Sequence, residues 1–208
     1  KRDGNPVIIM LHGLGGMGNN FMKIASCIKS DYGLIFPDLL GHGNSERPQD
    51  ITVKLQAESI HELIENLDIE KYYIGGNSYG GWVSLYHEYL HNGAEGIILI
   101  SSAGTNPNDK SFIERVMRMN PSNNPQTLEN ILHNNGSGEC KITEEMLGRI
   151  DCKTLIIWGE NDPIIPLEYG KFIHKGLKNS EFHIIEGGGH IAQVTHPEQV
   201  CSLVNNFL

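Results

Sequence analysis

The sequence predicts an α/β domain built on a mostly parallel β-sheet. Short apolar runs rich in β-branched and aromatic residues recur along the chain, as expected for buried strands. Segments with apolar residues three and four positions apart lie between these runs, as expected for helices. Strands that alternate with helices form parallel sheets with both faces covered, and their functional side chains lie in loops beyond the carboxyl ends of the strands.

The first expected strand is the continuous apolar run Val7 to Leu11. Similar runs predict five further strands, at residues 34–36, 72–74, 97–100, 154–158 and 182–185. The clearest helix covers residues 52–67, where the apolar residues form one stripe. Other helices are expected at residues 82–90, 166–177 and 197–208, the last two with a proline near the start.

Residues 105–150 break this alternation. The segment is rich in Asn, Pro and charged residues and has no strand-like run. Its apolar residues predict two short helices, one near residues 112–117 and one near residues 128–132. We therefore expect a core formed by residues 1–104 and 151–208, and a small helical lid formed by residues 105–150, because insertions of this length are more often functional than idle.

The composition restricts the partners and the location. A chain of 208 residues is long enough for one domain with a sizeable core. The formal charge of −9 argues against nucleic acid or an anionic membrane surface as a partner. No apolar run is long enough to cross a bilayer, and residues 1–6 lack the apolar stretch of a signal peptide. We therefore expect a cytoplasmic location.

The cysteines do not suggest a metal site. Cys27, Cys140, Cys152 and Cys201 show no CxxC spacing, so free thiols in a reducing compartment are expected.

A serine lies in a glycine-rich pattern directly after the third expected strand. Residues 76–80 read Gly-Asn-Ser-Tyr-Gly, which fits the G-x-S-x-G pattern of a nucleophile elbow. A sharp turn from strand to helix exposes and aims the serine, and it leaves no room for side chains two residues to either side. The alternative is an ordinary glycine-rich turn. The flanking strand and helix favour the elbow, with Ser78 as the candidate nucleophile.

Four more motifs follow expected strands. Asp162 follows the strand at residues 154–158, and His190 follows three glycines after the strand at residues 182–185. Nearer the amino end, residues 12–16 read His-Gly-Leu-Gly-Gly and residues 38–45 read Asp-Leu-Leu-Gly-His-Gly-Asn-Ser. The order Ser, Asp, His along the chain differs from the order in the chymotrypsin and subtilisin types of serine hydrolase.

Together these motifs resemble the α/β-hydrolase superfamily over nearly the whole chain, in particular its small esterases, haloperoxidase-like enzymes and meta-cleavage C–C hydrolases. The resemblance implies that Ser78 is the nucleophile, Asp162 the acid and His190 the base. It also implies an oxyanion hole formed by the backbone N–H groups of Leu14 and Tyr79. Family members carry two additional strands before the His-Gly motif, so either this chain is a minimal member or its first strands are missing.

Other residues compete for some of these roles. Glu160 is an alternative acid two residues from Asp162, and Asp109 follows a different strand. His183 is expected to pack within a strand and His196 to begin a helix. Two further histidines, His12 and His42, are expected to support loops through hydrogen bonds to the backbone.

His87 and Glu88 begin a His-Glu-Tyr-Leu-His match to the zinc motif H-E-x-x-H. The helix that would carry this match begins directly after the serine motif, and no third ligand is suggested nearby. The sequence therefore favours an enzyme without a metal or other cofactor.

The expected function is hydrolysis of esters with small or medium apolar acyl groups through an acyl-enzyme, as in a carboxylesterase. Phe112, Val116 and Met117 would line the substrate pocket if the lid closes over Ser78, although they would serve equally well in plain packing. Ser78, Asp162 and His190 could instead cleave C–C bonds or form peracids. A protein that only binds or senses a small molecule is the alternative outside the enzymes. The oligomeric state is left open.

Overall fold

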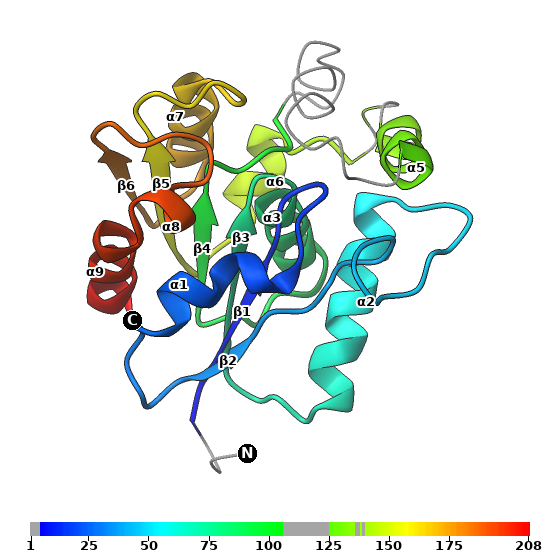
Figure 1. The fold of residues 1–208 in the computed structure, drawn as a ribbon, viewed down its shortest axis with the longest axis horizontal. Helices are drawn as coiled ribbons and strands as arrows, with labels where there is room; N and C mark the ends of the chain where they lie inside the picture. The colour runs from blue at the N-terminus through cyan, green and yellow to red at the C-terminus, as the bar shows by residue number, and fades with distance from the viewer. Residues whose placement is uncertain (1–4, 106–124, 136–137, 139) are drawn as a thin grey trace.

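A six-stranded parallel sheet forms the centre of the protein (Figure 1). The computed structural model describes residues 5–105, 125–135, 138 and 140–208. The strand order across the sheet is β2-β1-β3-β4-β5-β6, and every neighbouring pair is parallel. The strands are β1 (Val7–Leu11), β2 (Gly33–Ile35), β3 (Tyr72–Asn77), β4 (Gly96–Ile100), β5 (Lys153–Gly159) and β6 (Ser180–Ile185).

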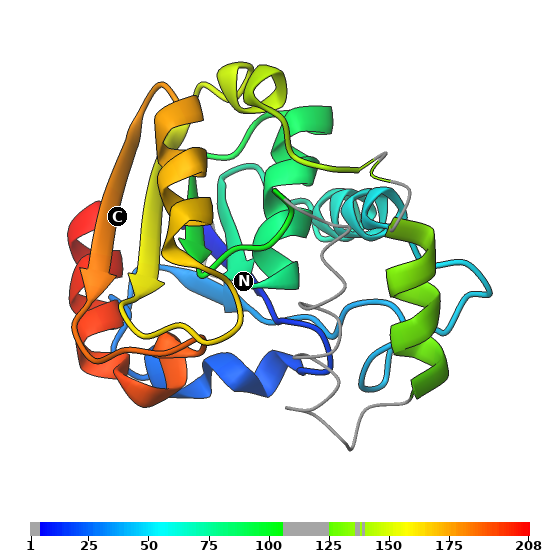
Figure 2. The ribbon, with the colours of Figure 1, turned by 90° about the horizontal axis from the view of Figure 1, so that it is seen from above.

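Helices cover both faces of this sheet (Figure 2). One layer contains α2 (Val53–Asn66), α3 (Tyr79–His91), α6 (Glu144–Gly148) and α7 (Leu167–Gly176). The other layer contains the 3-10 helix η1 (Gly18–Phe21), α1 (Met22–Ala25), α8 (Ala192–Thr195) and α9 (Pro197–Phe207). A further helix, α5 (Pro125–Asn135), lies near the loop before α2, where Asn130 accepts a hydrogen bond from the backbone N–H of Ile51.

Strand β1 shows why the sheet needs two layers. Ile9 and Leu11 belong to the apolar cluster beneath α2 and α3, whereas Ile8 and Met10 belong to the cluster beneath α1 and α9. All four side chains are almost completely buried. A strand that is buried on both faces reads as a continuous apolar run, which explains why the sequence predicts it so clearly.

The strand order determines where a site can form. The chain goes from β1 outward to β2 and then returns to the other side of β1 to form β3. Loops that leave β1 and β3 at their carboxyl ends therefore run in opposite directions and open a crevice between them. The His-Gly segment after β1 and Ser78 after β3 both lie at this edge.

The predicted alternation of strands and helices is confirmed. Each of the six expected strands is present, with bounds that differ by a few residues at most. The short helices η1, α1 and α8 were missed, because segments of four residues carry too little periodicity to show a pattern. Within the expected lid, α5 and α6 are helical. The first expected lid helix lies outside the described residues.

Free thiols were expected for all four cysteines, and this is wrong for two of them. Cys27 and Cys201 form a disulfide with a Cα–Cα distance of 6.0 Å, whereas Cys140 and Cys152 are free. Disulfides persist mainly in oxidising compartments, so the cysteines no longer support the expected cytoplasmic location. Spacing along the chain could not reveal this pair, since the partners are 174 residues apart. In the described ranges, no helix is both long and apolar enough to cross a bilayer.

Three histidines meet between α2 and α3. His61 stacks on His91 with ring centroids 3.8 Å apart, and the His87 ring lies 5.2 Å from that of His91. His87 is fully buried, and neither of its ring nitrogens has a hydrogen-bond partner in the described part of the chain. Burial, together with the neighbouring His91 and His61, lowers the pKa of His87 to about 3. The helix that bears Ser78 at its start therefore holds a neutral, buried imidazole against α2.

We expect this histidine to make the protein sensitive to acid. The unfolded chain takes up a proton on His87 near the ordinary pKa of about 6.5, whereas the folded protein takes it up only near pH 3. The free energy of unfolding should therefore fall as the pH decreases from about 6.5, by up to about 1.4 kcal/mol per pH unit. Urea unfolding of His87→Leu between pH 7 and pH 4 should show a shallower loss of stability than the wild type.

The matched control is His133→Gln, because His133 is exposed on α5. This variant should keep the wild-type pH dependence. An unchanged slope in His87→Leu would show that protonation of His87 does not contribute to acid unfolding.

Candidate active site

Ser78 occupies a strained turn between β3 and α3. Its backbone angles are φ 55° and ψ −113°, a conformation that is rare for a residue with a side chain. The turn is held by hydrogen bonds from the Ser78 N–H to the Ile100 carbonyl and from the Ala103 N–H to the Ser78 carbonyl. A Cβ atom at either Gly76 or Gly80 would overlap the Leu11 carbonyl oxygen. The two glycines are therefore required by the close approach of the elbow to β1.

His190 and Asp162 form a buried hydrogen-bonded pair at the same edge of the sheet. The Nδ1 atom of His190 lies 2.9 Å from one carboxylate oxygen of Asp162 and 3.1 Å from the other. Asp162 also accepts hydrogen bonds from the backbone N–H groups of Ile164 and Ile165. Burial alone would raise the pKa of Asp162, but the hydrogen bonds from His190 and these amides outweigh it and lower the pKa. The carboxylate is therefore charged and fixed in orientation.

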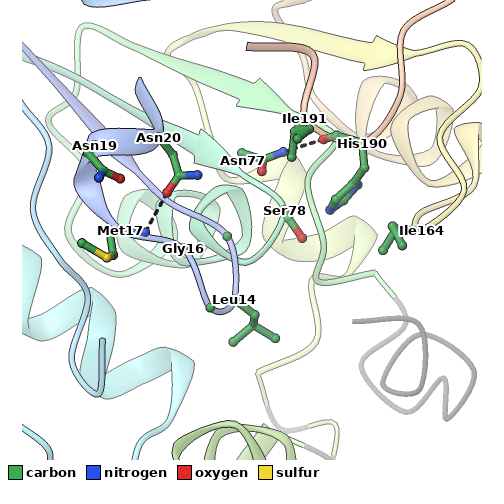
Figure 3. Close-up of a pocket in the computed structure, with 12 residues that line it drawn as sticks. Leu14, Gly16, Met17, Asn19, Asn20, Asn77, Ser78, Ile164, His190 and Ile191 are labelled. Atoms are coloured by element: carbon green, nitrogen blue, oxygen red, sulfur yellow. Dashed lines mark hydrogen bonds between the residues drawn. The ribbon is translucent and has the colours of Figure 1, made fainter. Parts of the chain in front are cut away.

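Ser78 and His190 line one cavity of about 270 Å³ (Figure 3). The Ser78 hydroxyl and the His190 ring point toward one another in this cavity. In the part of the chain described here, no direct hydrogen bond joins the two side chains, and catalytic contacts of this kind often tighten only when substrate binds. The cavity is lined by Gly13, Leu14, Gly15, Gly16, Met17, Asn19, Asn20, Asn77, Ser78, Ile164, His190 and Ile191.

Two histidines support the loop that forms one wall of this cavity. His12 Nε2 accepts a hydrogen bond from the Leu39 N–H, and His42 Nε2 accepts one from the Gly15 N–H. The Nδ1 atoms of both rings face backbone carbonyl oxygens, so each neutral ring donates on one side and accepts on the other. Burial lowers the pKa of both side chains, that of His12 to about 4. The predicted loop-support role of these histidines is confirmed by these bonds.

The competing residues lie elsewhere. Glu160 accepts a hydrogen bond from the Gly187 N–H instead of pairing with His190. His183 lies on the edge strand β6 beside Glu181, and His196 is the residue before α9, as expected. Asp109 is outside the described residues.

The predicted oxyanion and pocket residues are described only in part. Leu14 lines the cavity, whereas Tyr79 follows Ser78 at the start of α3 with its side chain buried in the core. Phe112, Val116 and Met117, which were expected to line the pocket, lie outside the described residues.

Two residues of the zinc-motif match make contacts with other groups of the protein. Glu88 accepts a hydrogen bond from the Ala94 N–H, and His91 lies 3.1 Å from the Glu58 carboxylate. Among the residues described, no three His, Cys, Asp or Glu side chains are arranged to hold a metal ion.

Several cavity residues were missed by the sequence analysis. Met17 precedes η1, and Asn19 and Asn20 lie within it, whereas Ile164 and Ile191 come from the loops that carry Asp162 and His190. Asn77 was seen only as part of the serine motif. Their positions in the sequence could have indicated them. Each lies in a segment that follows the carboxyl end of a strand, within a few positions of a residue of one of the motifs.

The chain matches a family model described as alpha/beta hydrolase fold, over residues 6–145 and 141–197. It is 26% identical to Lipase 3 of Moraxella sp. (strain TA144), covering 96% of this chain and 75% of that protein. It is 25% identical to a 2-hydroxy-6-oxononadienedioate/2-hydroxy-6-oxononatrienedioate hydrolase of Paraburkholderia xenovorans. This alignment covers 99% of this chain and 87% of that protein. Both alignments exceed 208 positions, so they contain insertions relative to this chain.

Solved structures agree on the fold. A putative lipase from Acinetobacter baumannii superposes with a TM-score of 0.84 at 21% identity, covering 99% of this chain and 84% of that one. A thermophilic esterase from Thermogutta terrifontis gives a TM-score of 0.78 at 22% identity, and the superposition covers 97% of this chain and 89% of that one. The family model covers most of the chain, and Ser78 occupies the strained strand-to-helix turn that its G-x-S-x-G motif predicts. This protein belongs to the α/β-hydrolase fold family.

Proposed function

We propose that the protein is a serine hydrolase that cleaves esters of small or medium uncharged acyl groups. The observation that carries this proposal is the shared cavity in which the Ser78 hydroxyl faces the imidazole of His190, while Asp162 holds the other side of that ring. A protein that only binds a ligand has no need of a strained serine beside an oriented imidazole. Similarity to a lipase and to an esterase supports the same class.

The reaction follows from this arrangement. His190 accepts the Ser78 proton at Nε2 while Oγ attacks the acyl carbon, and Asp162 stabilises the resulting imidazolium through Nδ1–H. The same proton is then passed to the leaving alcohol. Water, activated by His190, attacks the acyl-enzyme and releases the acid. We assign the oxyanion to the backbone N–H groups of Leu14 and Tyr79, donors whose individual loss typically costs on the order of 100-fold in rate.

The cavity lining supports an uncharged substrate. The lining consists of glycines, of Leu14 and other apolar side chains, and of polar groups that are neutral or, like His190, tied to the reaction. No Lys, Arg, Asp or Glu among the described residues lines it. A carboxylate on the acyl chain would gain no cationic partner from the described lining, and an unpaired charge that leaves water is costly. The volume of about 270 Å³ favours small acyl groups.

Hydrolysis of C–C bonds is the second candidate, and one observation favours it. The chain is similar to a hydrolase whose named substrates are dienedioates and trienedioates, and these carry two carboxylates. The absence of a cation from the described lining argues against substrates of that kind here. Ester hydrolysis therefore ranks first.

The nucleophile can be tested by covalent labelling. A fluorophosphonate should label the wild-type protein at one site, and Ser78→Ala should not label, because the oxygen that attacks phosphorus and displaces fluoride is absent. His190→Ala should label at least about 1,000-fold more slowly, since removal of a triad member costs several orders of magnitude. Intact-mass spectrometry measures both results. A folded wild-type protein that fails to label would favour the small-molecule binding alternative.

The acid can be tested with a matched pair of variants. Asp162→Asn should lower kcat by roughly 10⁴-fold on p-nitrophenyl butyrate, because an amide favours the wrong imidazole tautomer. Glu160→Gln should stay within about threefold of wild type, because the new amide oxygen still accepts the Gly187 N–H at this exposed position. The reverse ranking would make Glu160 the acid.

The acyl preference can be tested with two esters of equal length. The p-nitrophenyl ester of butyric acid should have a kcat/KM at least about tenfold above that of the succinic half-ester, a difference of about 1.4 kcal/mol. The reason is the unpaired carboxylate that the half-ester would bury. Equal or better cleavage of the half-ester would reveal a cation at the site and would raise the rank of the dioate-type substrates.

A further inference from the structure

The candidate base reaches the candidate nucleophile across half of the sheet. His190 follows β6, the outermost strand, whereas Ser78 follows β3, and two strands lie between them. The loop that carries His190 contains three successive glycines at residues 187–189 and passes directly over Gly159, where a Cβ atom would overlap the Gly188 and Gly189 carbonyl oxygens. A glycine-rich loop has high conformational freedom. Its position over Ser78 therefore has to be fixed by specific contacts.

Asn77 provides such a contact from the nucleophile's own strand. Its side-chain amide donates one hydrogen bond to the His190 carbonyl oxygen at 2.9 Å (Figure 3). The same amide donates another to the Ile100 carbonyl oxygen at 3.0 Å. The residue is 3% exposed. Both N–H groups of the amide are thus used, and they join the end of β3 to β4 and to the loop after β6.

The same carbonyl of Ile100 ties this link to the elbow. Ile100 also accepts a hydrogen bond of 3.0 Å from the backbone N–H of Ser78. The backbone of the nucleophile and the side chain of the preceding residue therefore share one acceptor at the end of β4. A displacement of the His190 backbone is resisted by a group that is fixed relative to Ser78.

We propose that Asn77 is a positioning residue for His190. It holds the His190 backbone so that the imidazole lies between Asp162 and the Ser78 hydroxyl. This inference rests on the proposed function, in which His190 is the base. The role needs two N–H donors directed at two carbonyl oxygens, which a carboxylate of the same shape cannot supply. A misplacement of about 1 Å in a reacting group can cost on the order of 100-fold in rate.

The test compares three variants. Asn77→Ala removes both donors, and Asn77→Asp removes them while keeping the shape of the side chain. Ser84→Ala is the matched control, because Ser84 is also buried near the elbow and its hydroxyl donates to the Gly80 carbonyl at 2.8 Å without touching the cavity. We expect kcat on p-nitrophenyl butyrate to fall about 100-fold in both Asn77 variants with KM within about threefold of wild type. Ser84→Ala should keep its kcat.

A spectroscopic measurement separates positioning from a general loss of structure. The proton that His190 Nδ1 donates to Asp162 should give a far-downfield resonance in the wild type, and this resonance should shift or disappear in both Asn77 variants. It should be retained in Ser84→Ala. Circular dichroism checks that each variant is folded, and Asn77→Asp serves if Asn77→Ala does not fold.

Each contrary result would contradict a different part of the proposed role of Asn77. Wild-type kcat in Asn77→Asp would show that the shape of the side chain is sufficient and would overturn the proposal. A raised KM with an unchanged His190 resonance would make Asn77 a substrate-binding residue instead, which also overturns it. Failure of the proposed function is recognised separately, because the wild-type protein would then neither label with a fluorophosphonate nor cleave the ester.

Discussion

The close approach of three backbone segments at the elbow is the constraint on which the rest of the site depends. The carbonyl of Leu11 at the end of β1 lies where a side chain at Gly76 or Gly80 would have to be. This contact brings β1, β3 and α3 together at the centre of the sheet. It also places Ser78 in a backbone conformation that would be costly on its own. The parallel ladder and the packed layer beneath α3 hold that conformation in place.

Burial gives the histidines of this protein different roles according to their partners. His12 and His42 are buried beside backbone donors and acceptors, so they act as neutral supports for the loop after β1. His87 is buried without partners for its ring nitrogens in the described chain, and it contributes packing together with a sensitivity to acid. His190 has a buried carboxylate on one side and a cavity on the other. A histidine that acts as a general base requires both features, and the residue type alone does not show which histidine has them.

Most of the fold could be predicted from the sequence, because strands buried on both faces read as apolar runs such as Val7 to Leu11. Ser78, Asp162 and His190 could be named because each follows such a strand in a recognisable motif. The link from Asn77 to His190 could not be predicted, since it joins residues 113 positions apart through one side-chain amide. The Cys27–Cys201 disulfide was missed for the same reason. Contacts between distant loops leave no periodic signal in the sequence.

The layer formed by α1 and α9 has a consequence for synthesis on the ribosome. Cys201 of α9 packs in the same cluster as Ile24 of α1, and Asn205 donates a hydrogen bond to the Cys27 carbonyl. The apolar side chains of Leu155 and Ile157 on this face of β5 are therefore not covered by α9 until residues 197–207 have been translated. A nascent chain with such an exposed surface is prone to aggregation until α9 has packed against it.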